Sequence, residues 1–147
     1  MAGWMDKLKE ATAGLMTEYS KLANKKVMKA TMAGIAMVMD ANGVVKDEEM
    51  ETMNNLIMRD PELKCYKYAE MMEVFNEVHD QFKVNKFAGQ GVALGYLGKI
   101  SDQKEARIII GKVCAIADSD GDFDVNEKAS VVKMCGVMPI QASEFGL

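Results

Sequence analysis

The chain has 147 residues, of which 49% are hydrophobic, and a net charge of −4. A chain of this length buries about 70% of its unfolded surface, so we expect a single domain over residues 1–147 that folds without disulfide staples. Residues 1–30 carry six lysines and three acids, a balance of +3, and the other 117 residues carry −7. This asymmetry argues against a nucleic-acid-binding protein, which needs a broad basic surface. It leaves open peripheral contact between residues 1–30 and an anionic membrane surface.

The cysteines and the hydropathy pattern indicate the compartment. Cys65, Cys114 and Cys135 are odd in number and far apart in the sequence, so they form neither a disulfide framework nor a CxxC motif. No apolar run reaches the roughly 18 residues of a spanning helix, and the first residues have no signal-peptide core. We therefore expect a soluble cytoplasmic protein.

Helical periodicity runs along the whole chain. Apolar residues recur at three- and four-residue steps, and no window shows the alternation typical of a strand. The sequence predicts an all-α fold, a single compact bundle of about seven helices. The predicted helical windows are residues 4–22, 27–41, 47–59, 67–83, 85–99, 101–118 and 126–136.

Turn residues separate these windows. Asn42-Gly43 tolerates positive φ and ends the second helix, and Asp60-Pro61 stops the third and caps a short new turn. Residues 85–99 contain four glycines, each costing about 1 kcal/mol in a helix relative to alanine. We expect close helix packing to be the reason for them.

An internal repeat is visible around two glycines. Placing Gly43 on Gly121, an offset of 78 residues, pairs Asp40 with Asp118 and Glu49 with Glu127. "AMVMDANGVVKDEEM" and "CAIADSDGDFDVNEK" are then two copies of an apolar helix, an acidic turn and an acidic helix start. This repeat predicts two related helical halves around a pseudo-two-fold axis.

Three physical accounts explain the acidic turn "DSDGDFDVNE". In the first, Asp124 and Glu127 form a capping box and further acids favour the helix N-terminus. This leaves Asp118 and Asp120 unexplained, because they sit at the C-terminal end of the preceding helix, where negative charge is unfavourable. In the second, the turn is an EF-hand loop with Gly121 at position six, Asp122 at seven and Glu127 at twelve. Its first ligand would then be Ile116, and Val38 in the other copy, so a standard EF-hand is not expected.

The third account is a site shared between the two turns. Asp40 and Glu49 would face Asp118 and Glu127 across the pseudo-two-fold axis, and the full ligand set would add Asp120 and Asp122. Carboxylate ligands suit Ca²⁺, Mg²⁺ or Mn²⁺ rather than zinc or copper. Spacing alone leaves capping and metal binding both open.

The remaining reactive side chains do not indicate an enzyme. His79 is the only histidine, and its place on a stripe with Phe75 and Phe82 favours a structural role over catalysis. Cys114 lies in an apolar helix, where burial raises a thiol pKa, so a thiol reductase is not expected.

At these residues the chain resembles the TerB family of tellurite-resistance proteins. The resemblance rests on the two acidic turns, "MDANGVVKDEE" and "ADSDGDFDVNEK", on "NKKVM" and "ELK", and on the terminal "SEFGL". It spans nearly the full length of the chain.

The resemblance implies an all-helical protein in two pseudo-symmetric halves that takes part in tellurite resistance and stress response. It also implies a non-enzymatic, divalent-metal-binding module in a complex with other tellurite-resistance proteins, including a membrane-embedded partner. The family's paired acidic positions correspond here to Asp40 and Glu49, and to Asp118 and Glu127. A metal-independent helical scaffold for protein interactions is the alternative.

The first turn departs from the family pattern. Lys46 stands where a small polar N-cap is usual, so we expect Asp47 to cap the third helix, and Asn42 replaces an acid. The second turn is therefore expected to dominate any cation binding.

Overall fold

The computed structural model describes residues 25–43, 45–119 and 121–147, and the helix predicted over residues 4–22 lies outside them. Within the described residues the fold is all-helical, with six α-helices, three short 3₁₀ helices and no strand. The prediction of an all-α fold is confirmed. The elements are α2 (Lys25–Met39), η1 (Asp40–Asn42), α3 (Asp47–Arg59), η2 (Leu63–Cys65), α4 (Tyr68–Val84), α5 (Lys86–Leu97), α6 (Gln103–Ala117), α7 (Val125–Gly136) and η3 (Ala142–Phe145).

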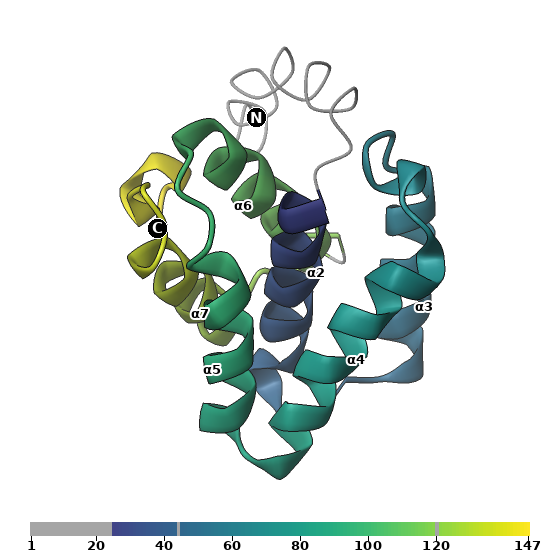
Figure 1. The fold of residues 1–147 in the computed structure, drawn as a ribbon. Coiled ribbons are helices and arrows are strands. Elements are labelled where there is room, and N and C mark those ends of the chain that lie inside the picture. The colour runs from purple at the N-terminus through teal and green to yellow at the C-terminus, as the bar shows by residue number, and fades with distance from the viewer. Residues whose placement is uncertain (1–24, 44, 120) are drawn as a thin grey trace.

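Helix α2 is the centre of the bundle (Figure 1). It packs against α4, α5, α6 and α7, and every residue from 30 to 40 is buried. A helix that is apolar on all sides is stable only when other helices cover all of it. Gly34 contributes to this packing, because an added Cβ would lie 2.8 Å from Val113 Cγ2 of α6. The core around α2 contains many methionines, whose flexible side chains fill irregular space.

The turn residues identified in the sequence form turns at the expected positions. Gly43 and Gly121 have φ values of 86° and 79°, a conformation that glycine adopts without strain. Asp60 Oδ1 accepts hydrogen bonds from the backbone N–H groups of Glu62 and Leu63, at 3.0 and 2.9 Å. The chain therefore leaves α3 at Asp60 and enters η2 directly.

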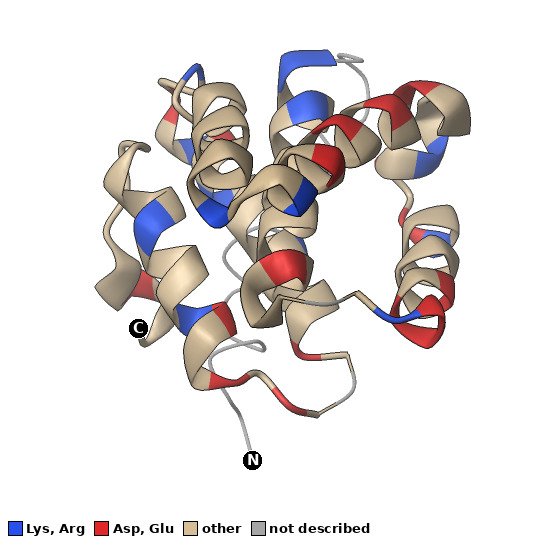
Figure 2. Cartoon of the chain, turned by 90° about the horizontal axis from the view of Figure 1, so that it is seen from below, with Lys and Arg blue, Asp and Glu red and all other residues tan. Residues whose placement is uncertain are grey.

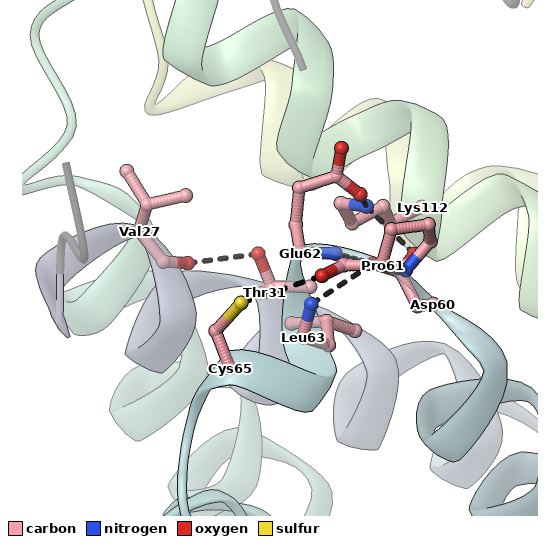
Figure 3. A network of polar contacts seen from close by, with 8 residues as sticks. All are labelled: Val27, Thr31, Asp60, Pro61, Glu62, Leu63, Cys65 and Lys112. Atoms are coloured by element: carbon pink, nitrogen blue, oxygen red, sulfur yellow. Dashed lines mark hydrogen bonds and ion pairs between the residues drawn. The ribbon is translucent and has the colours of Figure 1, made fainter. Parts of the chain in front are cut away.

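A buried ion cluster fastens this turn to α6 (Figure 3). Lys112 is only 8% exposed, and its Nζ lies 2.6 Å from Asp60 Oδ2 and 3.2 Å from Glu62 Oε2. Burial raises the pKa of Asp60, but the charge and hydrogen bond of Lys112 outweigh burial, and the pKa falls below 3.8. The cluster therefore holds Asp60 ionised in a half-buried position.

The expected close packing of the glycines in α5 holds at one position. A Cβ added to Gly89 would overlap the ring of Phe82 in α4, so this glycine lets the two helices approach. Gly91 and Gly95 have no neighbouring atom within 4 Å of an added Cβ. Internal packing does not explain those two glycines.

Candidate functional site

The two acidic turns lie side by side at one end of α2. Asn42 of the first turn donates from Nδ2 to Asp124 Oδ2 at 2.7 Å, and Asn126 donates from Nδ2 to Asn42 Oδ1 at 2.9 Å. Helix α7 also lies close to η1. Residues more than 80 positions apart in the sequence thus form one junction.

The second acidic turn contains a complete capping box at the start of α7. Asp124 Oδ1 accepts from the N–H of Glu127 at 2.8 Å, and Glu127 Oε1 accepts from the N–H of Asp124 at 3.0 Å. The predicted capping box is confirmed. The hydrogen bond from Glu127 is the main cause of the lowered pKa of Asp124.

In the first turn the N-cap is Lys46, so the prediction of Asp47 as the cap is wrong. Glu49 Oε1 accepts from the N–H of Lys46 at 3.4 Å, a long bond. The ammonium group of Lys46 contains no acceptor atom, so it cannot accept a hydrogen bond from a backbone N–H group of the helix. Asp47 and Glu48 instead occupy the first turn of α3, where negative charge favours the helix dipole.

The two paired glutamates line the same cavity. Glu49 and Glu127 line a space of about 190 Å³ whose other walls come from α3 and from the ends of α2 and α6. Glu48, Thr52 and Ser119 add further oxygen atoms, and the remaining lining residues are apolar. The cavity is thus lined by one of the paired glutamates from each half of the repeat.

Asp40 is directed to a different partner. It is 7% exposed, and both of its carboxylate oxygens lie 3.0 Å from Nδ1 of His79 in α4. We assign the shared proton to Nδ1, because an ionised carboxylate can only accept. Burial raises the pKa of Asp40, against the hydrogen bond and charge of His79, and the charge of Glu49 raises it further. His79 also stacks on Phe75, with ring centroids 5.9 Å apart.

Two further predicted ligands, Asp118 and Asp122, are not among the residues that line this cavity. Asp118 is the partly buried C-cap of α6 and its carbonyl accepts from the N–H of Gly121 at 3.0 Å. Asp122 is exposed, and Asp120 lies outside the described residues. Val38, the first residue of an EF-hand register, is fully buried inside α2. The first turn therefore does not have the EF-hand ligand arrangement.

In residues 25–43, 45–119 and 121–147, no three Asp, Glu, His or Cys side chains form a group that could hold a metal ion. The described geometry brings Glu49 and Glu127 to one cavity and places Asp40 on His79. The pairing of Asp40 with His79 and the bridge through Asn42 were not identified from the sequence. The sequence signal for the Asp40–His79 pair was the position of the single histidine on the buried side of its helix.

Residues 28–147 match the family model for "Tellurite resistance protein TerB". The chain belongs to the TerB family. The TerB-type chain is also 33% identical over 107 residues to a protein of Alcaligenes sp. named "Tellurium resistance protein TerB", a match that covers 70% of this chain and 88% of that protein. No solved structure gives a significant match.

In the described part of this TerB-family chain, no helix combines the length and apolar composition that crossing a membrane requires. Figure 2 shows basic and acidic residues distributed over several helices of the described chain.

Proposed function

We propose that this protein serves in tellurite resistance and stress response as a non-enzymatic module whose two acidic turns bind a divalent cation. The single observation that carries the proposal is the junction itself: Asn42 joins the turns, and Glu49 and Glu127 line one cavity. Family membership supplies the link to tellurite resistance. A cation between the turns would neutralise their like charges and fix the relative position of α3 and α7.

The candidate ligand atoms are chemically suited to a hard cation, but in the structure they are not arranged around one point. Carboxylate oxygens suit Ca²⁺, Mg²⁺ or Mn²⁺. Glu49 and Glu127 are the central ligands in this proposal, and Asp118, Asp120 and Asp122 are the additional ones. Because the described side chains do not already converge on one point, binding requires carboxylates to turn toward the cavity. Asp40 is the weakest of the six candidates, since His79 already holds its carboxylate.

The two buried thiols support a non-enzymatic role. Burial raises the pKa of Cys114 to about 12, with smaller contributions from Cys135 and Asp118, and raises that of Cys135 to about 11. Thiols with such pKa values are almost entirely protonated at neutral pH and are poor nucleophiles. Thiol-dependent reduction of tellurite is therefore not part of the proposal.

We further propose that the module works in the cytoplasm with other tellurite-resistance proteins, one of them embedded in the membrane. Membrane contact through residues 1–30 stays a prediction, and residues 1–24 lie outside the described residues.

We also propose that the chain consists of two related helical halves. The bounds of α2 and α6 differ by 78 residues at both ends, and so do Gly43 and Gly121, which supports a repeat of this period.

A metal-independent scaffold is the second candidate function. It is favoured by the hydrogen bonds from Asn42 and Asn126, which join the turns without any cation. In that case the acids serve to cap helices and to keep the surface charged.

Thermal unfolding in the presence of Ca²⁺, Mg²⁺ or Mn²⁺ separates the two functions. A cation that binds only the folded chain adds about 2.7 kcal/mol to the free energy of unfolding when its concentration is one hundred times Kd. Glu127→Gln and Glu49→Gln should lose this gain while keeping a side-chain acceptor for the capping box. Glu51→Gln, an exposed change in α3, is the matched control. Equal melting temperatures with each cation and with chelator would favour the scaffold.

A further inference from the structure

The turn between α4 and α5 exposes two apolar side chains. Phe87 is 83% exposed and Val84 is 69% exposed, although both are large hydrophobic residues. Figure 1 shows this turn at the lower extremity of the molecule, where the two helices meet. We call residues 83–87 the basic–apolar corner. Exposed apolar residues that cluster at one point of a surface mark an interaction site more often than scattered ones do.

The charges at the corner are positive. Lys83 directly precedes Val84 and Lys86 directly precedes Phe87, and both lysines are exposed. Lys83 lies 3.6 Å from Asp80, but both side chains are 66% exposed, and such a surface pair holds its charges weakly. The acidic side chains of α4 all come earlier in the helix, at Glu70, Glu73, Glu77 and Asp80. The helix is thus negative along its length and basic at its tip.

The corner is built rigidly. Asn85 is the only residue between α4 and α5, and its Oδ1 accepts from the N–H of Ala88 at 2.8 Å. The N–H of Asn85 donates to Gln81 O, and the N–H of Gly89 donates to Asn85 O, both at 3.2 Å. The Phe82 ring packs on Gly89 and fixes the two helices to each other. A turn whose backbone is bonded internally enters an apolar phase at lower cost.

We propose that the basic–apolar corner inserts into the interface of an anionic lipid surface. Phe87 and Val84 would enter the headgroup region, and the ammonium groups of Lys83 and Lys86 would meet the lipid phosphates. Charge complementarity and the convex position of the corner favour a lipid surface over an apolar partner groove. This inference does not depend on cation binding, so it is tested in the presence of chelator.

The test is sedimentation of the full chain with vesicles of equal parts phosphatidylglycerol and phosphatidylcholine. We expect binding that weakens with added salt and is small on pure phosphatidylcholine vesicles. Val84→Ser with Phe87→Ser should lower the partition coefficient about tenfold or more. Lys83→Gln and Lys86→Gln should lower it about fivefold each. Val125→Ser, at a side chain that is 81% exposed but in α7, is the matched control and should bind like the wild type.

A fluorescent probe places the corner directly. We expect Phe87→Trp in a Trp4→Phe background to show a blue shift of its tryptophan emission when anionic vesicles are added. Without these vesicles the emission should not shift. The proposal is overturned if the wild type does not bind these vesicles, or if the Val84→Ser, Phe87→Ser variant binds as the wild type does. It is equally overturned if binding depends only on Lys7 and Lys9, tested by Lys7→Gln with Lys9→Gln. Far-UV circular dichroism confirms that each variant is folded.

Discussion

Asn42 Nδ2 lies 2.7 Å from Asp124 Oδ2, although 82 residues separate the two side chains in the sequence. The contact joins η1 to the N-cap of α7, so each acidic turn depends on the other for its position. A change at Asn42 should therefore be felt in both turns. We expect Asn42→Ala to destabilise the protein by about 1 kcal/mol in urea unfolding, with Asn76→Ala, an exposed change in α4, as the control. Identical urea midpoints for Asn42→Ala and the wild type would show that the bridge has no energetic role.

The Asp40–His79 pair gives a pH dependence of defined sign. Burial raises the pKa of Asp40 above 3.8, so in the unfolded chain this carboxyl loses its proton at a lower pH than in the folded chain. As pH rises from below 3.8 through the raised pKa, ionisation of Asp40 lowers the stability of the folded state. Asp40→Asn removes this contribution while keeping an acceptor for His79. Its stability relative to the wild type should therefore increase over that pH range.

Urea unfolding from about pH 3 to about pH 7 measures this difference. Asp80→Asn, an exposed change in α4, is the control and should follow the wild type. A stability difference between Asp40→Asn and the wild type that decreases with pH would contradict the assigned cause.

The Lys112 cluster should behave in the opposite way. The pKa of Asp60 is below 3.8, so its contribution to stability is present above that pH and is lost as pH falls through the folded pKa. Lys112→Met leaves the carboxylates of Asp60 and Glu62 without their buried cation and should cost about 3–5 kcal/mol near neutral pH. The cost should shrink in acid, where the carboxylates become protonated. Lys104→Met, exposed in the same helix, should change the free energy of unfolding by less than about 0.5 kcal/mol.

Two glycines of α5 provide a matched pair of substitutions. Gly89→Ala places a methyl group against the Phe82 ring and should cost about 1–3 kcal/mol through displacement of that ring. Gly91→Ala meets no atom within 4 Å and should stabilise the helix by about 0.5–1 kcal/mol. Thermal unfolding of both variants measures the difference. Equal effects at the two positions would mean that α4 and α5 do not make this contact.

The thiols should differ in reactivity. Cys65 is exposed, whereas Cys114 and Cys135 are buried. With a disulfide reagent at neutral pH we expect one thiol to react in the folded protein and all three in urea. Rapid reaction of Cys114 in the folded protein would contradict its raised pKa and would reopen thiol chemistry with tellurite.

Features set by neighbouring residues were predicted well from the sequence. The predicted window at residues 47–59 coincides with α3, because Asp60-Pro61 stops a helix locally, and the Asp124–Glu127 capping box depends on a spacing of three. The cap of α3 was predicted wrongly because Lys46, which cannot accept a hydrogen bond, still adopts the extended N-cap backbone.

Features that depend on tertiary packing were not predicted. The contacts of His79 with Asp40, Asn42 with Asp124 and Lys112 with Asp60 join residues 39 to 82 positions apart. Periodicity identifies the buried face of a helix but does not say which helix covers it. Lys112 did carry a visible signal, as the single charge in the apolar run "IIIGKVCAIA". A lone lysine in such a run requires buried carboxylate partners.

The central claim is that the two acidic turns act as one cation-binding unit, and amide NMR during a Ca²⁺, Mg²⁺ or Mn²⁺ titration tests it most directly. Gly43 and Gly121 occupy equivalent positions in the two turns, so their amide signals report on each turn separately. With at least one of the cations we expect both signals to change along a single binding curve, and Glu127→Gln to suppress both changes together. Signals that stay unchanged at saturating cation, or that move with different affinities, would contradict a shared site.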